Sequence, residues 1–316
     1  MPFAALPERL KIVEVGPRDG LQNEGRTVPT EHKVELIERL AAAGLPQIEI
    51  TSFVDPRWIP QLADASEVAS RIQRRPGTEY TALVPNLIGY DKAREAGVDM
   101  AVLFLSASET HSRKNINKSV AEALAVCSQV AARASADGVR MRAYISTVFG
   151  CPYEGDIPVA STIQIARQLL DMGVEQVSLG DTTGLGTPMQ VDRYLAAIFE
   201  ELPVERFACH FHDTRGTALA NALVAIDHGV TTLDASVGGL GGCPYAPGAT
   251  GNLATDDLLY VLDSMGIETG VDLRQLLEIT RWICRDILDI DIPSRYAKAE
   301  LASRSRGEVK YGVRKS

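Results

Sequence analysis

One local pattern recurs along the chain and limits its fold more than any other feature. A helical stretch with one apolar face ends at a glycine, and a short run rich in β-branched residues follows. Glycine is favoured just after a helix because the backbone there often needs a positive φ. The run after it fits a strand that is buried on both faces, as in a parallel sheet. The glycines are Gly44, Gly97, Gly138, Gly173 and Gly229.

Three further runs bring the number of expected strands to eight, and they begin at Lys11, Glu79 and Arg206. A helical segment follows each strand, and eight such units in about 240 residues predict an α/β fold, the (β/α)8 TIM barrel. An open, doubly wound sheet is the alternative. It is disfavoured because no G-x-G-x-x-G motif follows the first strand.

The sequence after Asn252 predicts additional C-terminal helices. Residues 255–266 would close the barrel as its eighth helix, and residues 272–288 would form a cap. We therefore expect one catalytic barrel domain with its cap over residues 8–290. A basic, flexible tail over residues 291–316 would follow, either as a solvated terminus or as an arm near an anionic ligand.

Charge and cysteine content disfavour several classes of function. The net charge of −9 would repel phosphate backbones, so we expect no nucleic-acid partner. No run of about 18 apolar residues occurs, and the N-terminus lacks a basic and apolar leader, so we expect neither a membrane partner nor a signal peptide. The five cysteines form no C-x-x-C pair, which favours reduced thiols and a cytoplasmic location.

Polar residues gather where the expected strands end, which is where the active site of a TIM barrel lies. His210 and His212 are two positions apart on a strand and therefore face the same side, and Asp19 ends the first strand. This combination favours a metal site over two buried core histidines. Imidazole, carboxylate and amide ligands without a thiolate favour Mg²⁺ or Mn²⁺ over Zn²⁺.

Two more charged residues at strand ends have alternative interpretations. Arg18 could hold a substrate oxygen with its fork of donors, or it could pair with a strand carboxylate such as Glu49. Asp181 could be a general base, although spacing alone favours a cap for the following helix. A metal, an arginine, a carboxylate base and a thiol together suit the cleavage or formation of a carbon–carbon bond through an enolate.

Five stretches of the sequence strongly resemble the 3-hydroxy-3-methylglutaryl-CoA lyase family of TIM-barrel, metal-dependent lyases. They are VEVGPRDGLQNE (13–24), GCPYEG (150–155), GDTTGLGTP (180–188), HFHDT (210–214) and SVGGLGGCPYAPGATGNLATDDL (236–258). The resemblance extends over residues 8–290. It implies an acyl-CoA thioester substrate, 3-hydroxy-3-methylglutaryl-CoA, which is cleaved to acetyl-CoA and acetoacetate.

The resemblance also assigns roles to individual residues. The implied metal ligands are Asp19, His210, His212 and Asn252. Arg18 would stabilise the enolate oxygen, Asp181 would move the proton of the C3 hydroxyl, and Glu49 would support Arg18 and the cation. Cys243 would protonate the product enolate. The expected substrate-binding residues are Arg18, Gln22, Arg142 and Tyr144.

The chain departs from the family pattern at two places beside this site. Thr183 stands where an apolar residue is usual, and Arg215 and Thr217 stand where the family has tyrosine and glutamine. These changes leave open a related substrate, such as citramalyl-CoA or a longer 3-hydroxyglutaryl-CoA. A condensing synthase of the same barrel group is less favoured, because its glycine loop usually lacks a cysteine.

The glycine-rich segment 238–252 raises a separate question of function. Its glycine spacing matches neither G-x-G-x-x-G nor a P-loop, which disfavours a phosphate-binding module. We expect the segment to close over the bound thioester, with a hinge at residues 238–242 and an anchor on the metal at Asn252. We also expect a homodimer or a higher homo-oligomer.

Overall fold

The computed structural model describes residues 6–242 and 251–306 of the 316-residue chain. Its parallel strands form a closed barrel in chain order, in which the last strand pairs with the first. The strands are β1 (Lys11–Glu14), β2 (Gln47–Ser52), β3 (Glu79–Leu83), β4 (Met100–Ser106), β5 (Arg140–Ser146), β6 (Gln176–Asp181), β7 (Phe207–Phe211) and β8 (Thr232–Ala235). The predicted eight-stranded barrel is confirmed.

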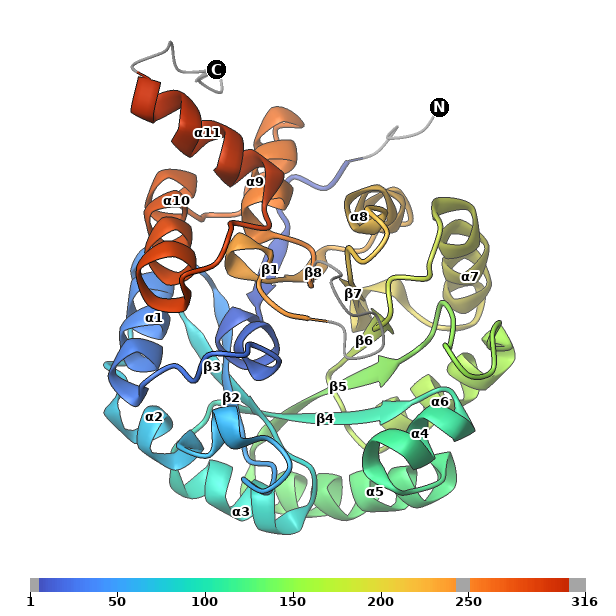
Figure 1. Ribbon diagram of the computed structural model, residues 1–316. Helices are drawn as coiled ribbons and strands as arrows, with labels where there is room; N and C mark the ends of the chain where they lie inside the picture. The colour runs from blue at the N-terminus through green and yellow to red at the C-terminus, as the bar shows by residue number, and fades with distance from the viewer. Residues whose placement is uncertain (1–5, 243–250, 307–316) are drawn as a thin grey trace.

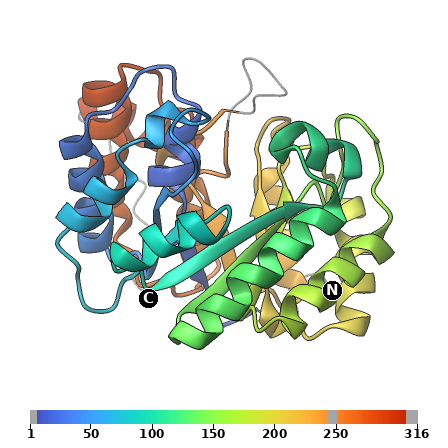
Figure 2. The same cartoon turned by 90° about the horizontal axis from the view of Figure 1, so that it is seen from below.

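Helices surround the barrel on its outer side (Figure 1, Figure 2). Every strand is followed by at least one helix, and two helices follow β4. The helices are α1 (Thr30–Ala42), α2 (Ala65–Arg71), α3 (Leu87–Glu95), α4 (Glu109–Ile116), α5 (Val120–Asp137), α6 (Val159–Asp171), α7 (Pro188–Glu201), α8 (Ala218–Asp227), α9 (Thr255–Ser264), α10 (Leu273–Arg281) and α11 (Arg295–Arg306). The apolar core lies between the strands and these helices.

The glycines that define the sequence pattern end helices as expected. All five have a positive φ, between 69° and 95°. Helix α5 shows both of its end signals clearly. Ser119 and Glu122 form a reciprocal capping box at its start, and Gly138 ends it in the left-handed conformation with φ 69°. The local sequence therefore determines where this helix begins and ends.

The interior of the barrel carries polar side chains instead of a purely apolar filling. An ion pair between Arg142 and Asp234 joins β5 to β8, and neither side chain is more than 1% exposed. The pairing of β2 with β3 shifts register between Glu49 and Thr51. Such a bulge bends a strand and redirects its side chains, and here it lies beside one of the predicted site residues.

The last helix, α11, packs against the two helices that precede it. Asp257 accepts hydrogen bonds from Ser294 Oγ at 2.6 Å and from the N–H of Tyr296 at 2.8 Å. The rings of Tyr260 and Tyr296 stack with centroids 4.5 Å apart. Helix α11 lies over α9 and α10 (Figure 1). The first part of the tail predicted over residues 291–316 therefore contains a packed helix; residues 307–316 lie outside the described part.

Among the residues described here, no helix is both long and apolar enough to cross a lipid bilayer.

Candidate active site

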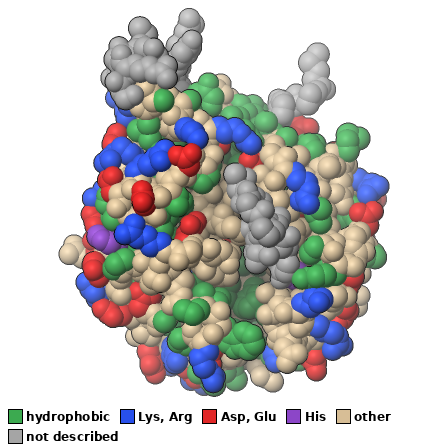
Figure 3. All heavy atoms as spheres, in the orientation of Figure 1, with side chains coloured by type: hydrophobic (Ala, Val, Ile, Leu, Met, Phe, Trp, Pro, Cys, Tyr) green, Lys and Arg blue, Asp and Glu red, His purple; other side chains and the backbone are tan. Residues whose placement is uncertain are grey.

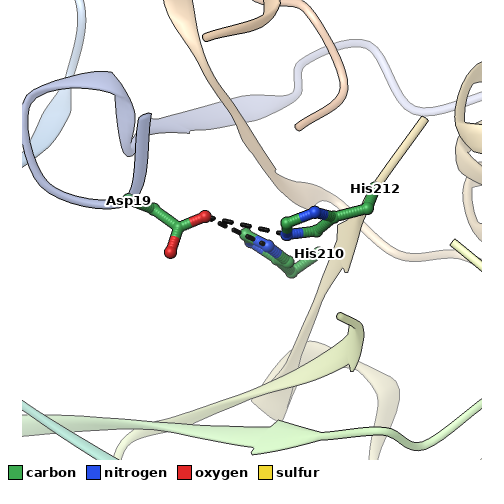
Figure 4. Close-up of side chains that lie close together, drawn as sticks. All are labelled: Asp19, His210 and His212. Carbon is green, nitrogen blue, oxygen red and sulfur yellow. Dashed lines mark ion pairs between the residues drawn. The ribbon is translucent and has the colours of Figure 1, made fainter. Parts of the chain in front are cut away.

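Three predicted metal ligands meet at the C-terminal end of the barrel. Asp19 lies in the π-helical turn η1 (Gly16–Gly20) after β1, His210 lies on β7, and His212 follows that strand. The Oδ2 atom of Asp19 is 3.9 Å from His210 Nε2 and 3.7 Å from His212 Nε2 (Figure 4). Their possible ligand atoms all lie within 4.8 Å of one another. One cation placed between them could contact all three.

Asn252 completes this cluster from the far end of the glycine-rich segment. It pairs with His212 in an isolated β-bridge, and its Nδ2 donates to Asp19 Oδ2 at 2.9 Å. Its Oδ1 is buried and has no hydrogen-bond partner among the described residues. An oxygen that is buried without a partner is costly, and a bound cation would satisfy it. This carboxylate, amide and imidazole set fits Mg²⁺ or Mn²⁺.

The ionisation states of these residues suit a cation. Burial, together with neighbouring His210, lowers the pKa of His212 to about 4, so its ring is neutral near pH 7. Burial opposes the ionisation of Asp19, yet Arg18 and the two histidines hold its pKa well below the usual range. A neutral imidazole and an ionised carboxylate are the forms that bind metal.

Asp234 lies behind one of the histidines and was not predicted from the sequence. Its Oδ2 lies 3.4 Å from His210 Nδ1 and accepts from Ser178 Oγ at 2.8 Å, while Oδ1 accepts from Arg142 Nη2 at 2.6 Å. A carboxylate behind a metal-binding histidine fixes the ring with Nε2 toward the metal. The sequence did contain a signal for this role. Asp234 is an acid within the short strand β8, and Arg142 on β5 is a base that also needs a buried partner.

Arg142 is held inside the barrel, and its contact with substrate stays a prediction. It is 1% exposed, and each of its guanidinium nitrogens is already bonded inside the barrel. Nε donates to Gln176, Nη1 to the hydroxyl of Tyr144, and Nη2 to Asp234. Strand alternation shows which face of the sheet a residue lies on, but not how deep in the barrel its side chain lies.

Arg18 and Glu49 form a buried ion pair beside Asp19, so the pairing alternative for Arg18 is confirmed. Arg18 Nε donates to Glu49 Oε1, and Nη1 donates to Asp19 Oδ1 at 2.6 Å. Tyr144 donates to Glu49 Oε2 at 2.9 Å. Burial disfavours the charge of Arg18, but Glu49 and Asp19 raise its pKa above the usual value. Its Nη2 has no hydrogen bond within the described residues and remains available to a ligand.

Asp181 binds backbone N–H groups, but in the loop before α7 and not at the helix itself. Its Oδ1 accepts from the N–H of Leu185 at 2.9 Å, and its Oδ2 accepts from that of Gly186 at 3.0 Å. A Cβ on Gly186 would lie 2.9 Å from Asp181 Oδ2, so a larger residue there would force the carboxylate to shift. Burial raises the pKa of Asp181 to about 6. A carboxyl group of this pKa can exchange protons near neutral pH.

The first part of the glycine-rich segment is held in place, which does not fit a hinge at residues 238–242. The N–H of Gly238 donates to Asp256 at 2.7 Å, and its carbonyl accepts from the N–H of Ser294 at 2.9 Å. The carbonyl of Leu240 accepts from Asn252 Nδ2 at 3.1 Å. Cys243 lies outside the described residues.

The remaining predicted residue, Gln22, is half-buried in the loop that follows η1. Figure 3 shows Lys and Arg side chains interspersed with Asp and Glu side chains over one face of the molecule.

The geometry of this site can be compared with known proteins. The family model described as HMGL-like matches residues 9–283. The chain belongs to the HMGL-like family. It is 50% identical to the hydroxymethylglutaryl-CoA lyase of Bacillus subtilis over 295 residues, which is 93% of this chain and 97% of that protein. It is 48% identical to the 3-hydroxy-3-isohexenylglutaryl-CoA/hydroxymethylglutaryl-CoA lyase of Pseudomonas aeruginosa over 297 residues, 94% of this chain and 99% of that protein.

Solved structures of family members have the same fold. The crystal structure of the Bacillus subtilis HMG-CoA lyase has a TM-score of 0.92 at 49% identity and covers 95% of this chain and 99% of that chain. An HMG-CoA lyase from Acinetobacter baumannii, in complex with coenzyme A and 3-methylmalate, has a TM-score of 0.89 at 39% identity, covering 94% of this chain and 97% of that chain. This similarity extends over nearly the whole barrel.

Proposed function

We propose that this member of the HMGL-like family cleaves 3-hydroxy-3-methylglutaryl-CoA to acetyl-CoA and acetoacetate. The observation that carries the proposal is the meeting of Asp19, His210, His212 and Asn252 beside the Arg18–Glu49 pair. Relatives about 50% identical over most of the chain are named for this substrate, which favours it, and the Pseudomonas relative is named both for it and for a longer 3-hydroxyglutaryl-CoA. The Acinetobacter structure with bound coenzyme A supports an acyl-CoA partner.

We propose that the cation is Mg²⁺ or Mn²⁺ and that Asp19, His210, His212 and Asn252 hold it. When bound, such a cation acts as a Lewis acid toward substrate oxygen atoms. The chain prepares its donors beforehand. His212 is kept neutral by burial, Asp19 is kept ionised by Arg18, and Asp234 orients the ring of His210.

Asp181 is the proposed base for the C3 hydroxyl of the substrate. Its raised pKa, about 6, lets it take that proton near neutral pH. As the O–H proton leaves, the C3–O bond becomes a carbonyl and the C2–C3 bond breaks. Acetoacetate departs with the new carbonyl, and the electron pair of the broken bond stays on C2 as a thioester enolate.

Arg18 is the proposed stabiliser of the enolate oxygen. Its Nε and Nη1 are engaged by Glu49 and Asp19, so the guanidinium cannot rotate freely. This leaves Nη2 as the donor for the negative charge that develops on the oxygen. Tyr144 in turn donates to Glu49 and accepts from Arg142. We therefore propose that Tyr144 and Arg142 position the Arg18–Glu49 pair from inside the barrel. Gln22 remains a candidate contact for the substrate.

Cys243 is the proposed acid that completes the reaction. Transfer of its thiol proton to C2 converts the enolate to acetyl-CoA, and the proton that Asp181 removed restores the thiol through solvent or product exchange.

The four described cysteines are buried free thiols, which supports the proposal of a reducing, cytoplasmic location. The homodimer or larger homo-oligomer stays a prediction, which analytical ultracentrifugation would check.

The proposal is tested by product analysis with a panel of acyl-CoA thioesters. Purified protein with Mg²⁺ should release acetyl-CoA and acetoacetate in equal amounts from 3-hydroxy-3-methylglutaryl-CoA. Turnover should be slower on citramalyl-CoA and on longer 3-hydroxyglutaryl thioesters. A higher kcat/KM for one of those thioesters would contradict the proposed substrate, and the absence of carbon–carbon cleavage with all of them would contradict the proposed reaction.

A further inference from the structure

Two side chains at the start of α8 hold the turn between β6 and α7, residues 182–186. Asn221, on α8, donates from Nδ2 to the carbonyl of Gly186 at 2.9 Å. Thr217, the residue before α8, donates from Oγ1 to the same carbonyl oxygen at 3.0 Å. Asn221 is fully buried, so its amide cannot exchange this contact for one with water without cost. The amide is therefore committed to the carbonyl of Gly186.

Gly186 links these two donors to the proposed base. Its N–H donates to Asp181 Oδ2 at 3.0 Å, while its carbonyl accepts from Thr217 and Asn221. A Cβ on Gly186 would lie 2.9 Å from Asp181 Oδ2 and 3.2 Å from the Cβ of Phe149, so the backbone here is in close contact with both side chains. Any displacement of Gly186 therefore moves a hydrogen-bond donor of the carboxylate.

The loop before α8 also holds the other half of the turn. Arg215 Nη1 donates to the carbonyls of Thr183 and Gly184, at 3.0 Å and 2.9 Å. Gly184 has a φ of 58°, and a Cβ there would lie 2.7 Å from the Cβ of Thr214. Arg215 and Thr217 are two of the positions at which the chain departs from the family pattern, and neither has a part in the proposed proton transfers. The turn thus takes its position from the loop that follows β7.

The position of this turn decides where the carboxylate of Asp181 points. Both of its oxygens accept from N–H groups of the turn, Oδ1 from Leu185 at 2.9 Å and Oδ2 from Gly186 at 3.0 Å. A base must lie within about 2.6–3.2 Å of the oxygen whose proton it takes. A displacement of about 1 Å can lower the rate by up to about 100-fold. A support for Gly186 is therefore also a support for proton transfer.

We propose that Thr217 and Asn221 are positioning residues, which hold Gly186 so that the carboxylate of Asp181 reaches the C3 hydroxyl of the substrate. This proposal rests on the proposed function, in which Asp181 is the base. The two side chains act on the backbone of the turn and do not themselves touch the substrate.

Substitutions of similar volume, combined in a double-mutant cycle with Asp181→Asn, test the proposal. Thr217→Val and Asn221→Leu each remove one donor to the carbonyl of Gly186. Each should lower kcat roughly 2- to 10-fold in the otherwise unchanged enzyme, with little change in KM, as expected for one lost hydrogen bond. Thr217→Ser keeps the hydroxyl and should keep kcat. In the Asp181→Asn background, where the base is absent, Thr217→Val and Asn221→Leu should lower kcat no further.

The matched control is Thr162→Val, which removes a fully buried hydroxyl on α6 that has no hydrogen-bond partner among the described residues. It should leave kcat unchanged. An undiminished kcat in Thr217→Val, or an equal loss in Thr217→Ser, would overturn the proposal, whether or not Asn221→Leu folds. So would a full, multiplicative loss in the Asp181→Asn background, or weaker Mn²⁺ binding by calorimetry, because the residues would then act through the fold or the metal. A normal rate for Asp181→Asn alone would instead remove Asp181 from the proposed function.

Discussion

Replacing Asp234 with asparagine removes one negative charge from the barrel interior and barely changes the shape of the side chain. Asp234 pairs with Arg142 at 2.6 Å, and the two side chains are 0% and 1% exposed. Removing one partner of a buried ion pair costs about 3–5 kcal/mol, because the other charge stays buried. We expect the free energy of unfolding of the Asp234→Asn variant to fall by about this amount in urea denaturation.

The same substitution should also weaken metal binding. Asp234 Oδ2 lies 3.4 Å from His210 Nδ1, opposite the Nε2 atom that faces the cluster. Loss of a carboxylate behind a metal-binding histidine typically lowers affinity or activity about 10- to 100-fold. Isothermal titration calorimetry with Mn²⁺ should show a rise of this size in the Kd.

Ser178→Ala is the matched control, because it removes a hydroxyl donor to the same Oδ2 atom and leaves the charge pair intact. It should cost about 1 kcal/mol of stability, which is the value of one hydrogen bond. Its Mn²⁺ affinity should stay close to that of the unchanged protein. A folded Asp234→Asn variant with unaltered Mn²⁺ affinity would refute the orienting role of Asp234, and unaltered stability would refute the cost assigned to the unpaired arginine.

Three other substitutions have expected outcomes. Arg215→Tyr removes two hydrogen bonds to carbonyls of the loop that follows Asp181 and should lower kcat roughly 2- to 10-fold; an unchanged kcat would show that this contact does not matter. Burial raises the pKa of Glu14 from 4.5 to about 7, so the folded protein binds its proton more tightly and stability falls as pH rises through this range. Between pH 4.5 and 7.5, the Glu14→Gln substitution should remove up to about 3 kcal/mol of this fall in the free energy of unfolding. A free energy of unfolding that falls with pH as steeply as in the unchanged protein would contradict this. Gly251→Ala puts a Cβ 1.8 Å from a backbone oxygen and should lower the melting temperature and kcat together, in contrast to Gly25→Ala, where a Cβ meets nothing within 4 Å.

The fold could be predicted from sequence because its signals are local. A glycine after each of five helices and a β-branched run after each glycine mark βα units that need no long-range information. The cluster of Asp19, His210 and His212 could be predicted for the same reason. His210 and His212 share a face by strand alternation, and the ends of parallel strands meet at one side of the barrel.

The parts that sequence reasoning missed depend on contacts between segments that lie far apart in the sequence. Arg142 and Asp234 are 92 positions apart and meet only because β5 and β8 enclose the same interior. The raised pKa of Asp181 comes mainly from burial, which its position in the sequence does not reveal. The packing of α11 was missed because its sequence is largely polar, and the helix is held by Asp257 and by the stacking of Tyr296 on Tyr260.

The central claim is that a divalent cation held by Asp19, His210, His212 and Asn252 is required for carbon–carbon cleavage. The most direct measurement combines Mn²⁺ binding, followed by electron paramagnetic resonance, with acetoacetate release from 3-hydroxy-3-methylglutaryl-CoA by the same chelator-treated protein. We expect one Mn²⁺ to bind per chain and no acetoacetate to form without added metal. Added Mn²⁺ should restore acetoacetate release in proportion to the occupancy of that site. The His212→Ala variant should lose both Mn²⁺ binding and acetoacetate release. Full acetoacetate release after exhaustive chelation, or unchanged Mn²⁺ binding in His212→Ala, would contradict the account.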